Sequence, residues 1–541
     1  MTLLELTLAA RGQRVAIFSA ATAAGVANAL ALLLVNEGAR TGSRPGIWTF
    51  LLFALAVCVF LVAARWTSHR INAVIEGTLH QIKVRIVGKI ERAPLRRLED
   101  IGTEEVFDRL TENMSVISAA ASAVGGVLQA VSIFVFALCY VAWLSPATFA
   151  VLLPLQLAAL ALYTSRVRVA DRLLREYNAR RVHFYELLMG LLRGAKEIKL
   201  NRARSREVCE DFTRASAGLR DVSTRFTYLF DDSMLFLTCN LYLVLAAVVF
   251  VLPEYVTLDE GMLPMLLAIV LFVWGNMEAA LGAYPIYVQA NQAMAAIDAL
   301  ERKLDGVGAR VETELELDPW SGAPGPIELA GASYEYASTS GEAPFRVGPI
   351  DLRCEPGEVT FIVGGNGSGK STLLKVLTGL YTPTRGALRC GAVTVEPENV
   401  GAYRELCSVI FSDFHLFSRT YGMLDLDAAR VEPLLRQMQL AGKTAFRQGR
   451  FTRRDLSTGQ RKRLAMILTL LEDRPVLVLD EWPADQDPEF RKYFYEELIP
   501  TWKRQGKTVI AVSHDDRYFH CADRVVRMES GRIRSVEPGG G

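Results

Sequence analysis

Six long apolar segments lie within the first 282 residues, and they constrain the fold more than any other feature of the chain. A helix needs about 20 consecutive apolar residues to cross a bilayer. The segments are Val15–Val35, Ile47–Ala64, Val124–Leu144, Ala147–Tyr163, Met234–Leu252 and Leu263–Gly282. The first could instead be a cleaved signal peptide, but its apolar run continues past the small residues Ala27–Ala29 and further segments follow. We therefore predict a helical domain that crosses the membrane six times.

Lysine and arginine are concentrated in two of the connections, at residues 65–111 and 166–225, whereas the alternate connections carry few of them. Positive charge marks the cytoplasmic side of a membrane protein, so both termini are expected in the cytoplasm. The two basic connections keep a helical pattern and are expected to form hairpins. Their tips, near Glu99–Asp108 and Asn201–Phe212, are expected to touch a cytoplasmic domain.

The composition changes after residue 302. Residues 305–326 are rich in proline and glycine and are expected to be a linker. Beyond them strand-like and helical runs alternate, which is typical of an α/β domain with a largely parallel sheet. We therefore expect a transmembrane domain at 1–304, the linker at 305–326 and an α/β domain at 327–541. The formal net charge of +1 argues against a broadly basic nucleic-acid binder, so no nucleic-acid partner is expected.

A phosphate-binding loop is the strongest local motif of the second domain. Its residues match GxxxxGK[ST] between an expected strand at Val359–Val363 and an expected helix at Lys370–Leu380. The glycines let backbone N–H groups surround phosphate oxygens, the lysine neutralises their charge and the serine can bind Mg²⁺. The predicted nucleotide-binding residues here are Gly364, Asn366, Gly367, Ser368, Gly369, Lys370, Ser371 and Thr372.

A second motif follows about a hundred residues later, where the apolar run Val476–Leu479 ends in two carboxylates. Such a run is typical of a central parallel strand whose carboxyl end faces a ligand. Asp480 is expected to hold the Mg²⁺, and Glu481 is placed to act as the general base on the attacking water. Acidic residues that merely cap the next helix are the weaker alternative beside such a loop.

Between these motifs lies Leu456-Ser457-Thr458-Gly459-Gln460. Ser457 could simply cap a helix. The five residues also resemble the ABC-family signature LSGGQ, with Thr458 replacing the first glycine. The resemblance implies ATP as ligand, a membrane domain of the ABC exporter type, and nucleotide contacts from Ser457, Gly459 and Gln460.

Other positions can be matched to the same family. Tyr336 corresponds to the aromatic that stacks on adenine, although an ordinary tyrosine at a strand end is the alternative. His514 corresponds to the switch histidine at the γ-phosphate, and Asp487 to the aspartate that ends the D-loop. Ser412 stands where most members have a glutamine that contacts Mg²⁺; its shorter side chain would need a bridging water.

The tract Trp482–Asp487 also departs from the commoner ATSALD. Together, LSTGQ, DEWPADQDP, SHDDRYF and FSDFHLF resemble the bacterial cyclic-peptide exporter branch, which includes exporters of a pyoverdine precursor and of syringomycin. Residues 194–200 resemble a loop that precedes the coupling helix of ABC exporters.

The resemblance implies that each ATP site is formed by the phosphate loop of one ABC domain and the LSTGQ segment of another, and that a full exporter has twelve spans. This chain has one set of motifs and six spans, so a homodimer in the bacterial inner membrane is expected. The expected function is ATP-driven export of a peptide-like small molecule, such as a siderophore precursor, cyclic peptide or lipopeptide, by alternating access. The alternatives are a lipid flippase, a microcin-type peptide exporter and an ATP-gated regulatory protein. Asn240 and Glu278 are candidates to line the cargo cavity, although Glu278 could equally form a structural salt bridge or lie at the membrane interface.

Overall fold

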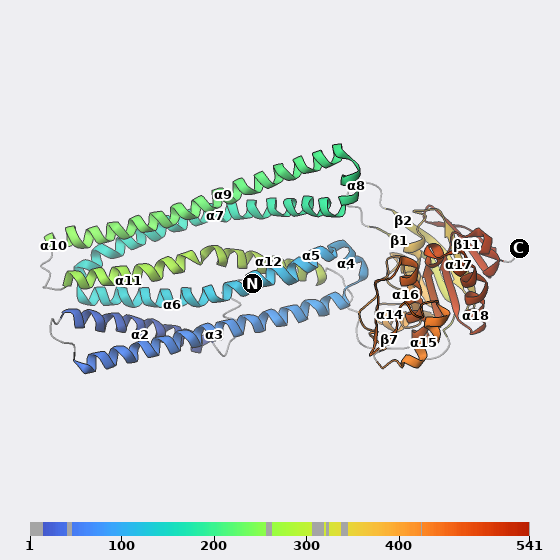
Figure 1. Ribbon diagram of the computed structural model, residues 1–541, viewed down its shortest axis with the longest axis horizontal. Helices are drawn as coiled ribbons and strands as arrows, with labels where there is room; N and C mark the ends of the chain where they lie inside the picture. The colour runs from blue at the N-terminus through green and yellow to red at the C-terminus, as the bar shows by residue number, and fades with distance from the viewer. Residues whose placement is uncertain are drawn as a thin grey trace. The chain divides into compact units, whose positions relative to one another are not determined.

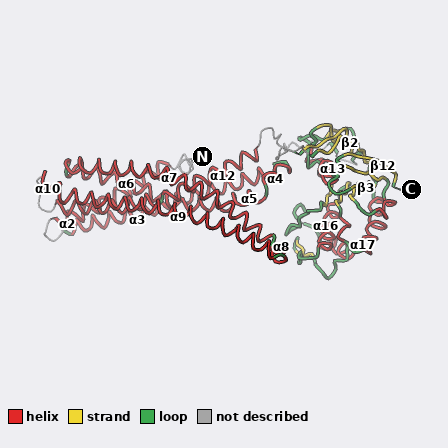
Figure 2. The backbone as a smooth tube through the Cα atoms, turned by 90° about the horizontal axis from the view of Figure 1, so that it is seen from above, coloured by secondary structure: helices red, strands yellow, loops and turns green. Residues whose placement is uncertain are grey.

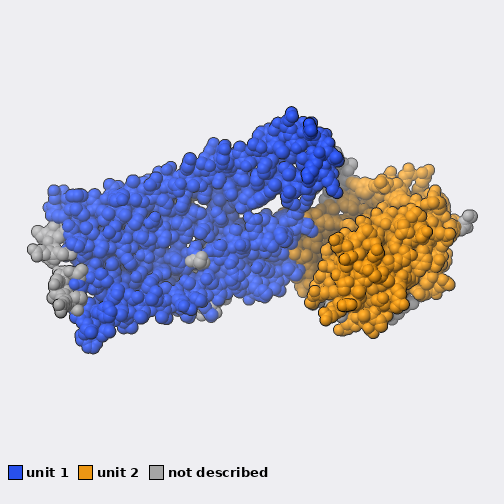
Figure 3. All heavy atoms as spheres, viewed as in Figure 1, with its two compact units in different colours: residues 1–87, 103–302 blue, residues 88–102, 303–541 orange. Residues whose placement is uncertain are grey.

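The computed structural model describes residues 14–40, 46–255, 262–305, 319–320, 324–336, 345–423 and 425–539. They belong to two compact units (Figure 3). Unit 1 comprises residues 1–87 and 103–302, and unit 2 comprises residues 88–102 and 303–541. Of the expected linker at 305–326, residues 306–318 and 321–323 lie outside the described part of the chain.

Unit 1 is built from helices, whereas the described strands all belong to unit 2 (Figure 2). Within the described part of the chain, six helical segments are long and apolar enough to cross a membrane. The described α-helices up to residue 305 are α2 (Arg14–Arg40), α3 (Ile47–Arg92), α4 (Leu95–Ile101), α5 (Thr103–Asp108), α6 (Met114–Leu144), α7 (Pro146–Arg193), α8 (Ala195–Leu200), α9 (Arg202–Ala246), α10 (Leu252–Tyr255), α11 (Met262–Gly282) and α12 (Tyr284–Asp305).

Within unit 1, α6 packs against both α2 and α11, and α7 runs beside α9 (Figure 1). Small residues allow α2 and α6 to approach closely, since a Cβ added at Gly25 would lie 2.6 Å from the Cβ of Ser132. Large apolar side chains such as Trp48 and Phe250 point outward, with exposed fractions of 76% and 74%. Such an apolar exterior is suited to lipid rather than to water.

The second hairpin turns earlier than expected. Gly194 ends α7, the short helix α8 follows, and the Asn201 side chain accepts hydrogen bonds from the N–H groups of Ala203 and Arg204 at the start of α9. Residues 202–212 therefore belong to the long helix α9 instead of the tip. The Asn201 cap sets where α9 begins, because it satisfies N–H groups that the first turn of a helix leaves unpaired.

The described residues of unit 2 form a six-stranded sheet in the order β12-β11-β3-β10-β9-β6, in which β12 runs antiparallel to β11 and the other described pairs are parallel. A four-stranded antiparallel sheet has the order β2-β1-β4-β5. The strands are β1 (Ile327–Glu335), β2 (Arg346–Cys354), β3 (Val359–Gly364), β4 (Arg385–Cys390), β5 (Val393–Thr394), β6 (Cys407–Ile410), β7 (Phe446–Arg447), β8 (Arg450–Phe451), β9 (Val476–Asp480), β10 (Thr508–Val512), β11 (Arg524–Glu529) and β12 (Arg532–Pro538).

Both faces of the six-stranded sheet are covered, which explains the continuous apolar runs of its strands. Leu477 and Leu479 of β9 enter one core, while Val476 and Val478 enter the other. The helices that follow the strands are α13 (Lys370–Leu377), α14 (Val400–Arg404), α15 (Ala428–Gln437), α16 (Thr458–Glu472), α17 (Pro488–Tyr493) and α18 (Ile499–Arg504). Helix α13 ends three residues before the expected Leu380, because Gly379 adopts a left-handed φ of +69°.

Candidate functional site

The sheet order brings three loops to one edge. Strand β10 lies between β3 and β9, and its last residue, Val512, pairs with Ile362 on one side and with Asp480 on the other. Because the three strands are parallel, the residues after each of them meet at the same edge. This edge of the sheet thus brings together the loop Gly364–Gly369, Glu481 and His514.

The loop from Gly364 to Gly369 connects β3 to α13 and requires its glycines. Gly369 has a φ of +97°, and a Cβ there would lie 2.8 Å from a methyl carbon of Val347. The buried ammonium of Lys370 folds back and donates to the carbonyls of Gly364 and Gly365, both at 3.0 Å. The loop borders an open cavity of about 730 Å³, which is also lined by Ser513 and His514.

Glu481 and His514 are in direct contact. The His514 Nε2 and the Glu481 Oε1 lie 2.8 Å apart, and the Lys370 Nζ is 4.0 Å from the same oxygen. Since a carboxylate only accepts, the contact needs the proton on Nε2. Glu481 has a left-handed φ of +48°, which is costly for a residue with a side chain. The two expected catalytic residues therefore meet beside the lysine.

The residues expected to hold Mg²⁺ fit a cation. Asp480 is buried, and its Oδ1 has no hydrogen-bond partner in the described part of the chain. Burial and the adjacent Glu481 carboxylate raise the pKa of Asp480, whereas hydrogen bonds from Ser371 and Ser412 oppose the rise. A buried carboxylate beside two hydroxyl groups is an oxygen-rich set of the kind that Mg²⁺ prefers.

Tyr336 follows β1 and is held from two directions. Its hydroxyl is 2.8 Å from the Thr372 hydroxyl, and the Arg96 guanidinium lies 4.8 Å from the centre of its ring. Arg96 belongs to α4, whose residues group with unit 2. Through these two contacts Tyr336 connects α13, the helix after the phosphate loop, to α4.

A second residue of α4, Glu99, is bound in the same unit. It accepts a hydrogen bond from Lys375 at 2.7 Å and another from the Tyr381 hydroxyl. Partial burial opposes its ionisation, but these two hydrogen bonds lower the pKa of Glu99 below its ordinary value. Sequence reasoning expected contacts from this tip, yet it did not identify Arg96, Lys375 or Tyr381.

Ser457 is the N-cap of α16. The N–H of Gln460 donates to the Ser457 hydroxyl at 3.4 Å, and the Gln460 side chain accepts from the N–H of Ser457 at 3.3 Å. The described residues that line the phosphate-loop cavity include none from 457–460. The structure therefore brings the phosphate loop, Asp480, Glu481 and His514 together at one edge of the sheet, whereas Ser457, Gly459 and Gln460 lie at the start of α16.

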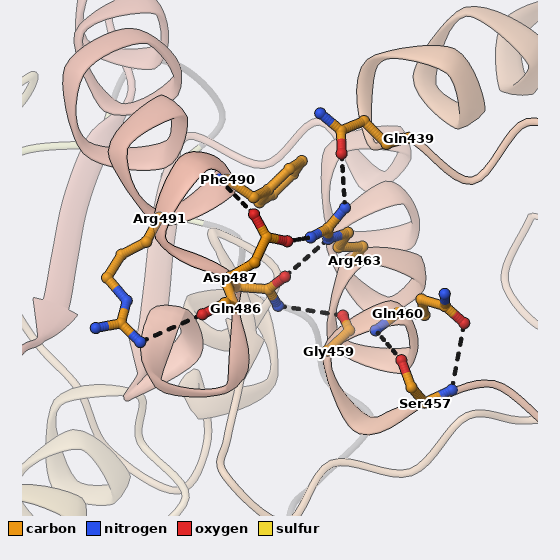
Figure 4. A network of polar contacts seen from close by, with 9 residues as sticks. All are labelled: Gln439, Ser457, Gly459, Gln460, Arg463, Gln486, Asp487, Phe490 and Arg491. Atoms are coloured by element: carbon orange, nitrogen blue, oxygen red, sulfur yellow. Dashed lines mark hydrogen bonds and ion pairs between the residues drawn. The ribbon is translucent and has the colours of Figure 1, made fainter.

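Asp487 is the N-cap of α17, where its carboxylate accepts the N–H of Phe490 at 2.9 Å and pairs with Arg463 of α16 (Figure 4). The hydrogen bond from Phe490 lowers the pKa of Asp487 more than partial burial raises it, and Arg463 adds to this effect. Sequence reasoning selected Asp487 but missed Arg463. The signal was present as a basic run directly after LSTGQ and as the two acidic residues Asp485 and Asp487 after Glu481.

The helices of unit 1 enclose a largely apolar cavity of about 320 Å³. Its polar lining comes from Gln156 and Tyr163 of α7. Neither Asn240 nor Glu278 is among its lining residues; Asn240 is buried in α9 and Glu278 is exposed. The two polar residues singled out from the sequence therefore do not line this cavity.

Comparison with known proteins decides the family. Residues 347–484 match the ABC transporter family. The chain is 31% identical over 540 residues to the ATP-binding protein SyrD of Pseudomonas syringae pv. syringae, an alignment that covers 94% of this chain and 92% of that protein. The chain belongs to the ABC transporter family.

Two further relatives agree. An ATP-dependent lipid A-core flippase of Alkalilimnicola ehrlichii is 26% identical over 465 residues, which cover 83% of this chain and 77% of the flippase. A bacterial Atm1-family ABC exporter, solved with ATP bound, superimposes with a TM-score of 0.75 at 16% identity and covers 97% of this chain and 94% of its own. The ABC exporter fold is thereby confirmed.

This ABC protein is a half-transporter, with a helical membrane domain and an ATP-binding domain fused in one chain. It is a multi-pass membrane protein of the exporter class, and it couples ATP hydrolysis to transport.

Proposed function

We propose that this ABC half-transporter exports a peptide-like secondary metabolite, such as a siderophore precursor, a cyclic peptide or a lipopeptide, across the bacterial inner membrane. One observation carries the proposal: the combination LSTGQ, DEWPADQDP, SHDDRYF and FSDFHLF, which resembles the cyclic-peptide exporter branch. The 31% identity to SyrD extends along nearly the whole chain and supports it.

The apolar lining of the 320 Å³ cavity supports a cargo with an aliphatic or aromatic surface, such as a lipopeptide. A lipid flippase is the second candidate, because several similar proteins are named lipid A-core flippases. The same apolar cavity would suit an acyl chain, so the cargo has to be decided by transport itself.

For hydrolysis, we assign the general base to Glu481 and its orientation to His514, on the strength of their 2.8 Å contact. Asp480 and Ser371 would hold Mg²⁺, with Ser412 reaching it through a water. The ion, when bound, neutralises phosphate charge in the transition state. Lys370 would exchange its two carbonyl partners for phosphate oxygens, and Tyr336 would stack on adenine.

A homodimer is the proposed active unit, with both termini in the cytoplasm. Ser457, Gly459, Gln460 and Asp487 would contact the ATP held by the phosphate loop of the second copy. The resemblance of LSTGQ to the ABC-family signature supports this assignment. ATP would close the dimer, and hydrolysis would release it, so that the membrane helices alternate between inward and outward openings.

Transport into inside-out vesicles tests the cargo. The purified protein would be reconstituted and supplied with ATP and a fluorescent lipopeptide, a cyclic peptide or a labelled lipid. Glu481→Gln protein serves as the matched control for leakage. ATP-dependent accumulation of a peptide is expected; movement of the lipid with no accumulation of either peptide would favour the flippase and overturn the proposal.

A further inference from the structure

The segment after Glu481 is packed tightly against the first turns of α16. A Cβ added at Gly459 would lie 2.5 Å from the carbonyl oxygen of Asp485, so only glycine permits this approach. The buried Trp482 donates its indole N–H to the carbonyl of Lys462 at 2.9 Å. Its ring also packs against Phe494, with ring centres 4.8 Å apart. The unusual Trp482–Asp487 tract is thus fitted to α16.

Lys462 is the central residue of this contact. The residue is buried, with an exposed fraction of 4%. Its ammonium donates to the carbonyl oxygen of Glu481 at 2.9 Å and pairs with the Asp485 carboxylate at 2.7 Å. A buried ammonium requires such partners, because an unpaired charge away from water is costly. The commoner tract ATSALD has alanine where this chain has Asp485, and so offers no anionic partner there.

The carbonyl that Lys462 holds belongs to a strained residue. Glu481 has a φ of +48°, and its carbonyl also accepts the N–H of Ala484 at 3.2 Å. Rotation of the Glu481 backbone would move its carboxylate away from His514, because the carbonyl and the side chain of Glu481 extend from the same Cα. A strained conformation persists only where its surroundings fix it, and Lys462 supplies a charged hydrogen bond at that point.

A parallel set of contacts fixes the rest of the tract, as Figure 4 shows. Arg463 donates to Gln486 at 2.7 Å and to Gln439 at 3.1 Å, and it lies 3.6 Å from the centre of the Phe490 ring. Gln486 in turn donates to the carbonyl of Gly459 at 3.1 Å. With this second set in place, loss of the Lys462 contact should loosen Glu481 while leaving α16 and the tract joined.

We infer that Lys462 is a positioning residue for ATP hydrolysis. Asp485 fixes the Lys462 ammonium, and Lys462 holds the Glu481 backbone so that the Glu481 carboxylate faces the nucleotide. The inference rests on the proposed role of Glu481 as general base. It extends that role, because it assigns a function to two charged residues that none of the motif roles uses.

The test measures ATP hydrolysis by the full-length protein in lipid nanodiscs. Lys462→Met keeps the aliphatic stem and removes the charge; it should lower kcat by about 10- to 100-fold, as misplacement by about 1 Å does elsewhere, and leave KM for ATP unchanged. Lys462→Arg should restore most of the rate. Asp485→Asn should lower kcat by a smaller factor. Lys443→Met, at an exposed lysine of the same unit, serves as the control.

A cycle with Glu481→Gln separates positioning from general stability. In single-turnover measurements, Lys462→Met should change the residual rate of the Glu481→Gln protein by less than about two-fold, because the group that it positions is already lost. Equal losses in both backgrounds, or a rise in KM that accounts for the whole defect, would overturn the inference.

If Lys462→Met protein fails to fold, Asp485→Asn carries the test, and a wild-type kcat in that variant rejects the inference. Hydrolysis that survives Glu481→Gln would instead reject the assignment of the base. Loss in Glu481→Gln together with a normal rate in folded Lys462→Met would reject the positioning role alone.

Discussion

The phosphate loop and the start of α16 lie in the same unit but differ in how far their polar groups are satisfied. On the phosphate-loop side, Lys370 is bound to carbonyls of its own loop and the buried Asp480 Oδ1 has no described partner. At the start of α16, Ser457 and Gln460 satisfy each other in a reciprocal cap.

This difference indicates how each region can work. The first region borders an open cavity and contains a buried carboxylate oxygen, Asp480 Oδ1, that has no partner among the described residues, so it offers room for the proposed nucleotide and a ligand atom for the proposed Mg²⁺. At the start of α16, Ser457 and Gln460 already satisfy each other. The proposed contact of this region with ATP therefore has to come from a nucleotide that is bound elsewhere. Under the proposed homodimer, that addition comes from the second copy.

The largest expected effect is at the phosphate-loop side. Glu481→Gln should lower steady-state hydrolysis by at least about 100-fold, because the side chain that accepts the proton is lost, and bound ATP should be retained. Release of inorganic phosphate measures the rate, and radiolabelled ATP that stays with the protein on gel filtration measures the retention. Glu489→Gln, at an exposed acid of α17, is the control. Wild-type hydrolysis in Glu481→Gln would exclude Glu481 as the base.

A mixing experiment challenges the comparison directly. Lys370→Ala and Ser457→Asp should each inactivate the homodimer. In a dimer of one chain of each kind, the proposed arrangement puts both defects in one ATP site and leaves the other intact.

Random pairing makes about half of the dimers mixed, and each mixed dimer keeps one of its two ATP sites. About a quarter of the wild-type activity should therefore return. Hydrolysis by co-expressed, doubly tagged protein measures it, and each variant expressed alone gives the background. Absence of recovery would mean that Ser457 acts in the ATP site of its own chain.

Stability separates the two possible roles of Ser457. Ser457→Ala should lower the free energy of unfolding by about 1 kcal/mol through loss of the cap, whereas Ser457→Asp caps well and should retain it. Both should lose hydrolysis if the hydroxyl contacts phosphate, since aspartate adds a negative charge there. Chemical unfolding of the detergent-solubilised protein, followed by tryptophan fluorescence, gives the first quantity. Full activity in Ser457→Asp would restrict Ser457 to capping.

The smallest effect is expected at Ser412. Ser412→Gln should lower the Mg²⁺ concentration for half-maximal hydrolysis by about two- to five-fold, because the longer side chain can reach the ion without a bridging water. A Mg²⁺ titration at saturating ATP measures it, with Ser418→Gln as the control. An unchanged requirement would show that this position does not sense the metal.

Features that depend on a short stretch of chain were predictable. The six apolar segments appear as membrane-length helices because length and apolarity alone decide whether a helix can cross a bilayer. The phosphate loop was found because its glycines and lysine act through backbone geometry within a few residues. Local capping, in contrast, displaced two expected boundaries, at Asn201 and at Gly379.

Contacts between distant segments were not predictable in the same way. The sequence showed that Trp482–Asp487 was unusual, but not that Lys462 would bind Asp485 or that Arg463 would bind Gln486. Likewise, Tyr336 could be matched to a motif, while its contact with Arg96 crosses 240 residues of chain.

By itself, the sequence determined the membrane-spanning helices, the nucleotide chemistry and the family, because each depends on local composition or on a short motif. The tertiary structure alone decided which side chains contact Glu481 and that the Asp480 Oδ1 has no partner among the described residues. Those contacts depend on the order of parallel strands and on the close approach of α16 at Gly459, and neither is encoded within any single stretch of chain.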